Sequence, residues 1–206
     1  MATIIRPQTT TIHWPIAAGL PLLVLPVIAV ALTYTQTAWV QMWSLAFAIF
    51  AGFRWLTFAT SPAARRADLS QGAGYLFLWT GMDADAFFSA EAKPAKPRWT
   101  EWVWAVAQTV FGFWLLLALA PRFVESHPLV AGWVAMTGFV SILHFGVSQL
   151  LSILWRSAGV NARHIMHKPV FARSLADFWG DRWNLAFRDL MHKLVFQPLV
   201  QSIGVA

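Results

Sequence analysis

The stretch "LVAGWVAMTGFVSILHFGVSQLLSILW", residues 129–155, decides the fold class of this protein. It contains no Asp, Glu, Lys or Arg, and it is longer than the roughly 20 residues with which a helix crosses a bilayer. We therefore expect a transmembrane helix that tilts or projects beyond the bilayer. Similar apolar runs predict three more transmembrane helices, at residues 15–34, 38–59 and 101–120.

The composition agrees with a membrane protein. Of the 206 residues, 58% are hydrophobic and only 12% are charged, whereas soluble proteins carry about twice that share of charge. We predict an all-α polytopic protein with a single membrane domain over residues 1–206. It should contain about four transmembrane helices plus re-entrant or interfacial helices. The absence of cysteine excludes disulfides, thiolate metal sites and a cysteine nucleophile.

Basic residues predict the orientation of the chain. They lie around the 60–100 connection and in the 156–200 region, whereas the opposite side offers only Arg122. The positive-inside bias then places the N-terminus, the 60–100 connection and the 156–200 region in the cytoplasm. Within that connection, "GYLFLWTGMD" is too short to span and suits a re-entrant or interfacial segment. The basic residues used are Arg54, Arg65, Arg66, Lys93, Lys96, Arg98, Arg156, Arg163, Lys168 and Arg173.

The net charge of +6 fits the same view. In these connections the basic residues orient helices and meet anionic lipid, so the lipid bilayer is the expected partner and nucleic acid is not. The segment "MATIIRPQTTTIHWP" lacks a signal-peptide cleavage pattern, so the first apolar run is expected to be a retained helix.

His144 falls near the middle of the 129–155 run, with Ser141 and Ser148 close by. An ionisable residue inside a span usually faces a protein interior or a water path and marks function. The alternative is a neutral histidine that is hydrogen-bonded across helices, for which Gln108 is a candidate partner.

Two other groups allow more than one interpretation. His164 and His167 have a spacing that could ligate a metal on a helix, but no carboxylate is near in sequence, so no metal site is predicted. Asp83 and Asp85 could form a carboxylate pair for acid–base chemistry, or they could cap a following helix.

The richest polar stretch is "DFWGDRWNLAFRDLMHKLVF", residues 177–196. If it forms one helix, Asn184, Arg188 and His192 are spaced i, i+4 and i+8 and share a stripe. Such a helix could lie at the membrane interface with this stripe facing headgroups or a protein cavity. An ordinary amphipathic surface helix would have the same periodicity.

The same stretch resembles the wax synthase-like proteins of the membrane-bound O-acyltransferase (MBOAT) superfamily, which carry a Phe-Trp-Gly-Arg-Arg-Trp-Asn element. Asp181 replaces the first Arg, and this resembles the Asp of the sterol and diacylglycerol acyltransferase branch. The segments "YLFLWTGMDADAF" and "LHFGVSQLLSILWR" are similar to bacterial members, so the resemblance covers residues 74–200. The matching residues are Phe178, Trp179, Gly180, Arg182, Trp183 and Asn184.

The resemblance implies transfer of a long-chain acyl group from acyl-CoA, a co-substrate, to a hydroxyl acceptor, with no covalently bound cofactor. It implies a catalytic Asn184 and a histidine that acts as general base later in the chain, where only His192 is available. Binding of the acyl-CoA is then expected of Trp179, Asp181, Arg182, Trp183 and Arg188.

The family's usual carboxy-terminal third, with its histidine in a separate apolar segment, does not follow the motif here. The alternative function is therefore a non-catalytic scaffold subunit of a larger membrane complex, derived from a truncated acyltransferase. In either case we expect a partner membrane protein or a homo-oligomer. The resemblance to bacterial members places the protein in the bacterial inner membrane.

Overall fold

The computed structural model describes residues 16–89 and 94–203, and within these ranges it contains helices and no strands. The predicted all-α fold is confirmed. Three helices are long and apolar enough to cross a membrane: Ala38–Thr60, Trp99–Phe123 and Pro128–Ser157. The first predicted span forms a shorter apolar helix, α1 (Ile16–Thr33), with Pro21 and Pro26 inside it. Lys93 and the segment before Ile16 lie outside the described residues.

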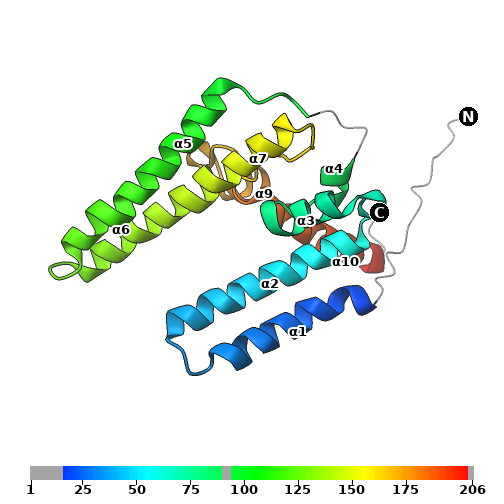
Figure 1. Ribbon diagram of the computed structural model, residues 1–206, viewed down its shortest axis with the longest axis horizontal. Helices are drawn as coiled ribbons and strands as arrows, with labels where there is room; N and C mark the ends of the chain where they lie inside the picture. Colours follow the sequence, from blue (N-terminus) through cyan, green and yellow to red (C-terminus); the bar gives the residue numbers. More distant parts are fainter. Residues whose placement is uncertain (1–15, 90–93, 204–206) are drawn as a thin grey trace, which may run out of the picture. The chain divides into compact units, whose positions relative to one another are not determined.

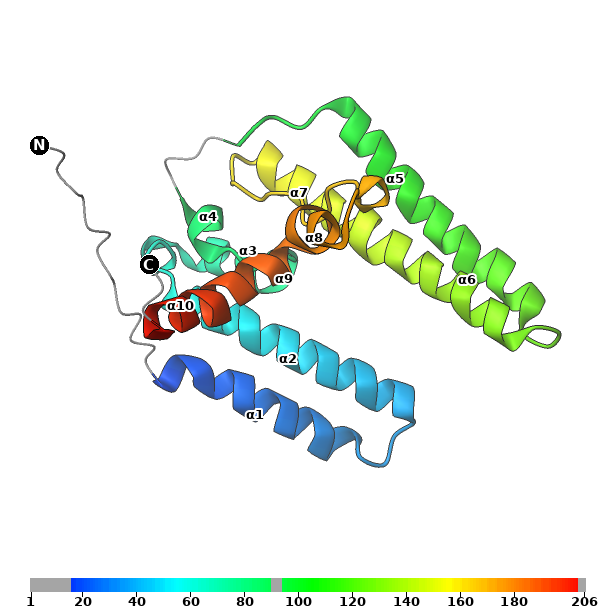
Figure 2. The same cartoon turned by 180° about the vertical axis from the view of Figure 1, so that it is seen from behind.

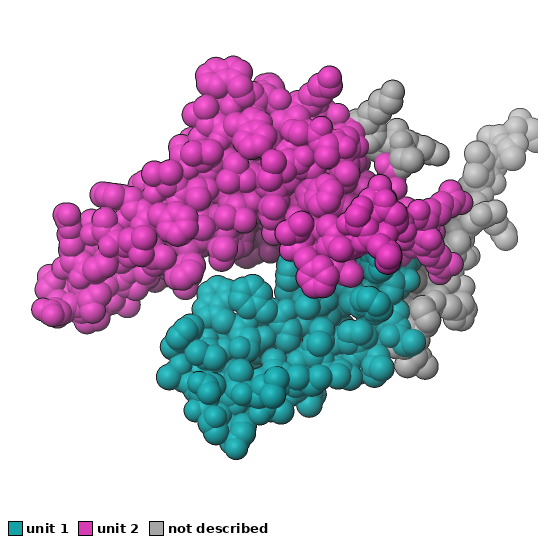
Figure 3. Space-filling view, viewed as in Figure 1, with its two compact units in different colours: residues 1–60, 189–206 teal, residues 61–188 magenta. Residues whose placement is uncertain are grey.

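The chain forms two compact units, one of residues 1–60 and 189–206 and the other of residues 61–188 (Figure 3). In the first unit, α1 packs along α2 (Ala38–Thr60) as an antiparallel pair (Figures 1 and 2). Gly52 permits the close approach, because a Cβ there would lie 2.6 Å from the Cα of Leu22. The same unit contains α10 (Gln197–Ile203).

A long antiparallel hairpin dominates the second unit (Figure 1). Its first arm is α5 (Trp99–Trp114), which continues through a π-helical turn (Leu115–Leu119) and a 3-10 turn (Ala120–Phe123). Its second arm is α6 (Pro128–Val140), a π-helical segment (Ser141–Val147) and α7 (Ser148–Ser157).

Small residues hold the two arms of this hairpin together. A Cβ on Gly112 would lie 2.6 Å from the carbonyl oxygen of Gly138, and Gly146 lies directly against Thr109. In an apolar solvent helices associate through such close backbone contacts, because burial of apolar surface gives little driving force there. The glycines therefore fix the register in which the second arm, including His144, faces the first.

An aromatic cluster joins the short helices α3 (Leu69–Leu78) and α4 (Ala84–Phe88) to α7. Tyr75 is fully buried, and its ring centroid lies 5.2 Å from that of Phe87, which lies 5.1 Å from Trp155. The indole N–H of Trp155 donates to the carbonyl of Leu78 at 2.9 Å. The predicted short apolar patch thus forms part of this cluster and not a membrane-spanning helix.

Asp83 and Asp85 serve local structure. Asp83 Oδ1 accepts from the Ala86 backbone N–H at 2.9 Å, which is an N-cap of α4. Asp85 Oδ1 accepts from the Ser61 hydroxyl at 2.5 Å. Of the two interpretations of these acids, helix capping is confirmed for Asp83.

The prediction of one continuous helix over residues 177–196 is wrong. The backbone runs through α8 (Leu175–Asp177) and a π-helical turn (Phe178–Arg182), breaks, and resumes as α9 (Leu185–Met191) and a second π-helical turn (His192–Phe196). The break lies at Asn184, whose φ of 44° is left-handed and cannot continue a right-handed helix. The predicted stripe of Asn184, Arg188 and His192 therefore does not form.

Candidate functional site

His144 lies in the π-helical segment Ser141–Val147, in the middle of the longest apolar helix. Short π-helical insertions change the direction of side chains within a helix and are frequent at functional sites. Here the His144 ring stacks on Trp183, with ring centroids 5.6 Å apart and an interplanar angle of 18°. The structure thus brings together two residues predicted separately, one from a span and one from the aromatic–Asn motif, residues 178–184.

His144 Nδ1 is buried and has no hydrogen-bond partner among the residues that the structure describes. No hydrogen bond joins Gln108 to His144 in that part of the chain, so the pairing across helices predicted as an alternative does not form there. Ser148 instead donates to the His144 carbonyl oxygen at 2.5 Å. A buried, unpaired ring nitrogen calls for an explanation, and a catalytic role is one of the few available.

Trp183 is the centre of an aromatic group. Its ring stacks with Phe178 at 5.4 Å and 14°, and Phe145 meets it at 6.4 Å in an edge-on arrangement. Phe178 in turn meets Trp179 edge-on at 5.0 Å. Trp179 itself is largely exposed. The motif therefore packs its second tryptophan against the His144 helix and leaves its first outside.

Asn184 forms the turn between the π-helical turn and α9. Asparagine tolerates the left-handed conformation better than most residues, and it is also a favoured helix cap. Both properties are used, because its Oδ1 accepts from the Phe187 backbone N–H at 3.3 Å. Its own backbone N–H donates to Met166 Sδ at 3.2 Å. Asn184 thus has a structural role that its spacing in the sequence did not indicate.

The segment of residues 163–168, which we call the pairing loop, holds this turn. The backbone N–H of Leu185 donates to the carbonyl of Ile165 at 2.9 Å, and the N–H of His167 donates to the carbonyl of Arg182 at 2.8 Å. Together with the Met166 contact, these bonds attach the pairing loop to both sides of Asn184.

The charged residues of the motif contact one another and the backbone. Arg182 Nε donates to Asp177 Oδ1 at 2.7 Å, and its Nη1 donates to the Lys168 carbonyl at 3.3 Å. The hydrogen bond from the Arg173 backbone N–H, followed by that from the Arg182 side chain, lowers the pKa of Asp177. Arg188 Nη1 donates to the Gly180 carbonyl at 2.7 Å and lies 3.7 Å from Asp181 Oδ1. Arg182 is thus engaged internally, whereas Asp181 is largely exposed.

His192 lies in the other compact unit, where its ring stacks on Phe196 at 5.2 Å. The shared helical face that would have linked it to Asn184 is absent, because the helix begins only after Asn184. His144 is the histidine that the structure shows in ring contact with the motif.

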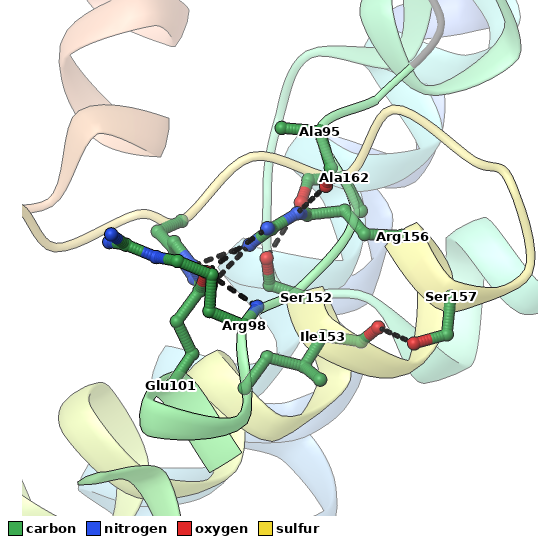
Figure 4. A network of polar contacts seen from close by, with 9 residues as sticks. Ala95, Arg98, Glu101, Ser152, Ile153, Arg156, Ser157 and Ala162 are labelled. Atoms are coloured by element: carbon green, nitrogen blue, oxygen red, sulfur yellow. Dashed lines mark hydrogen bonds and ion pairs between the residues drawn. The ribbon is translucent and has the colours of Figure 1, made fainter.

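A cluster of Glu101, Arg156 and His164 was not predicted as a unit. Figure 4 shows Glu101 and Arg156. Arg156 Nη1 donates to Glu101 Oε2 at 2.7 Å, and His164 Nε2 lies 2.8 Å from the same oxygen. The sequence feature that indicated this cluster was Glu101, an acid at the start of an apolar run. An acid in that position requires a partner for its charge. Glu101 Oε2 therefore contacts both Arg156 and His164. The described residues contain no group of three or more His, Asp or Glu that could hold a metal.

Comparisons with known proteins find partial similarity to two acyltransferases. The chain is 28% identical over 101 residues to a probable long-chain-alcohol O-fatty-acyltransferase of Arabidopsis thaliana, covering 49% of this chain and 29% of that protein. It is 44% identical over 39 residues to an acyl-CoA–sterol O-acyltransferase of the same plant, covering 19% of this chain and 11% of that protein. No protein-family profile and no solved structure matches. The matched segments span less than a third of the length of each of these two relatives.

Proposed function

We propose that this protein is an MBOAT-like O-acyltransferase that moves a long-chain acyl group from acyl-CoA to a hydroxyl acceptor, with His144 as general base. The observation that carries the proposal is the stacking of the His144 ring on Trp183 of the motif, with a buried and unpaired Nδ1. The similarity to acyltransferases that act on a long-chain alcohol and on a sterol supports the substrate class.

The chemistry requires one proton acceptor. The neutral imidazole of His144 takes the proton of the acceptor hydroxyl as its oxygen attacks the thioester carbonyl. The new C–O bond forms, the C–S bond breaks, and the CoA thiolate leaves. The imidazolium then returns its proton to the thiolate, so the enzyme ends in its starting state. A site within the apolar helices limits the access of water, which would otherwise hydrolyse the thioester.

Trp183 and Asn184 serve the base in different ways. Stacking on Trp183 restricts rotation of the His144 ring, so the reactive nitrogen is presented in one orientation. Asn184 fixes the turn that places Trp183, through its left-handed backbone and its cap on α9. We therefore assign to Asn184 the structural role of forming this turn. The motif then affects the reaction through the contact of Trp183 with His144.

Basic residues around the motif suit the phosphates of CoA. Arg163, Lys168 and Arg173 are exposed, and Arg188 is partly exposed. Phosphate oxygens accept strong charge-assisted hydrogen bonds from such side chains. The positive-inside bias supports a cytoplasmic position for this region, where acyl-CoA would be available.

The test is ester formation by membranes that contain the wild-type chain, supplied with labelled long-chain acyl-CoA and a mixture of fatty alcohols. Removal of a general base typically costs a factor of 10² to 10⁴, so His144→Gln should lose about a hundredfold or more in kcat. His192→Gln is the matched control, since it makes the same change in the other compact unit, and it should retain activity.

Full activity of the His144→Gln protein would contradict the assignment of the base. Loss of activity in His192→Gln alone would return the role to His192. A folded wild-type chain that forms no ester would instead favour the non-catalytic scaffold.

A further inference from the structure

We infer that the cluster of Glu101, Arg156 and His164 positions the pairing loop, and that it thereby fixes the turn at Trp183 and Asn184. Its effect on catalysis rests on the function proposed above, but its effect on the geometry of the motif does not. Glu101 comes from the start of α5 and Arg156 from the end of α7 (Figure 4). His164 belongs to the pairing loop.

Glu101 is the centre of the cluster. Its Oε2 accepts from Arg156 Nη1 at 2.7 Å and lies 2.8 Å from His164 Nε2. Its Oε1 accepts from the Arg98 backbone N–H at 3.1 Å and receives a longer contact of 3.4 Å from Arg156 Nη2. One carboxylate thus caps α5, binds the guanidinium at two points and holds the histidine of the loop.

The cluster is shielded from water, so these bonds contribute to stability. The side chains of Arg156, Glu101 and His164 are 10%, 16% and 29% exposed. Arg156 Nε also donates to the Ala95 carbonyl at 3.0 Å, which ties in the segment before α5. An ion pair on an open surface contributes little, whereas loss of one partner from a shielded pair leaves a charge without compensation.

The bond between His164 and Glu101 has a defined direction. His164 Nε2 lies 2.7 Å from Arg156 Nη1 and 2.8 Å from Glu101 Oε2, and one nitrogen cannot both accept from the first and donate to the second. His164 Nδ1 is buried without a partner among the described residues, and a lone pair is less costly to leave there than an N–H. We therefore assign the proton to Nε2, which donates to Glu101 Oε2, while Arg156 Nη1 donates to the same oxygen and not to the ring.

Residues 165–167, which follow His164, connect the cluster to the motif by hydrogen bonds. Ile165 accepts from the Leu185 N–H, Met166 accepts from the Asn184 N–H, and His167 donates to the Arg182 carbonyl. No helix lies between the cluster and these contacts. Displacement of His164 therefore acts on the turn directly, in addition to any effect on the hairpin.

Acid should weaken the anchor. Burial lowers the pKa of His164 from its ordinary value of 6.5; Glu101 opposes this shift, while Arg156 and His167 add to it. The folded site thus disfavours the protonated ring relative to a ring released into water. Stability from the bound neutral ring is fully present above about pH 6.5 and is lost as the pH falls below it.

The experiment measures amide hydrogen exchange of the 206-residue chain in lipid nanodiscs, peptide by peptide, together with ester formation. His164→Phe keeps an aromatic ring but removes the N–H, whereas His164→Gln places an amide N–H near the position of Nε2. Arg98→Gln is the control, because it removes an exposed contact to the same Glu101, from a side chain that is 82% exposed.

We expect His164→Phe to accelerate exchange about tenfold in peptides covering residues 165–168 and 182–187, with kcat reduced and KM little changed. His164→Gln and Arg98→Gln should exchange like the wild type. In the wild type, acidification from about pH 7.5 to about pH 5.5 should reduce protection of these peptides after correction for intrinsic rates. The His164→Gln protein should not show that loss.

Unchanged exchange in the motif peptides of His164→Phe would overturn the inference, whatever the activity. An equal rise across residues 99–157 would also overturn it, since the cluster would then only stabilise the hairpin. If the wild type forms no ester but the exchange pattern is as expected, the proposed function fails and the positioning role stands.

Discussion

Among single residues, Asn184 has two structural roles, one of its side chain and one of its backbone. Its side chain caps α9 and its backbone is left-handed, so its presence in the motif has a structural reason independent of catalysis. Substitution by alanine would remove the cap and strain the backbone at the same time. Other substitutions are needed to separate the structural requirement from a chemical one.

Asn184→Asp keeps a cap acceptor and a residue type that tolerates positive φ, but it removes the amide N–H donor. Asn184→Gly keeps the backbone freedom and, as a cap, costs only a few tenths of a kcal/mol. If the role is structural, both variants should keep most of the ester-forming activity and should unfold within about 1 kcal/mol of the wild type. A loss of activity in both, with unchanged thermal unfolding, would show that the amide itself is required.

At the scale of the element, the glycines of the α5–α6 hairpin set the distance between its arms. Gly112→Ala would place a Cβ against the Gly138 carbonyl and should destabilise the protein by about 1–3 kcal/mol, because the arms must move apart. Gly132→Ala is the matched control in α6, where nothing lies within 4 Å of the added atom. Thermal unfolding in detergent measures both. Equal unfolding temperatures for the two variants would contradict the close packing.

The sequence predicted the elements that are governed by hydrophobicity. Long apolar runs predicted the hairpin arms, and an acid before a short helix predicted the Asp83 cap. It did not predict the break at Asn184, because the helical spacing of side chains in residues 185–196 continues back through the motif without interruption. The left-handed φ of Asn184 depends on hydrogen bonds to the pairing loop, which the spacing does not encode. The contact of His144 with Trp183 joins residues 39 positions apart, which no local pattern encodes.

The Glu101 cluster was missed for a related reason. Arg156 and His164 are 55 and 63 residues from Glu101, and each alone fitted a simpler role in topology or at the interface. Only the antiparallel hairpin brings the start of α5 beside the end of α7 (Figure 1). An acid at the edge of an apolar run indicates that a partner is needed, but it does not say which.

In the whole molecule, use of cytoplasmic acyl-CoA requires the motif to face the cytoplasm. Since the chain contains no cysteine, single cysteines can report its orientation. A membrane-impermeant maleimide added to spheroplasts, whose inner membrane is intact, should label Ser126→Cys, in the exposed turn of the hairpin. Ala176→Cys, exposed beside the motif, should react only after the membrane is opened. The reverse pattern would contradict the proposed orientation.

If His144 and Trp183 act as one unit in acyl transfer, a double-mutant cycle will show it. Ester formation is measured for the wild type, His144→Gln, Trp183→Phe and the double variant, each checked for equal thermal unfolding. If Trp183 acts by holding the His144 ring, its substitution should cost activity in the wild type and nearly nothing once His144 is gone. Losses that simply add, or a His144→Gln protein as active as the wild type, would contradict the account.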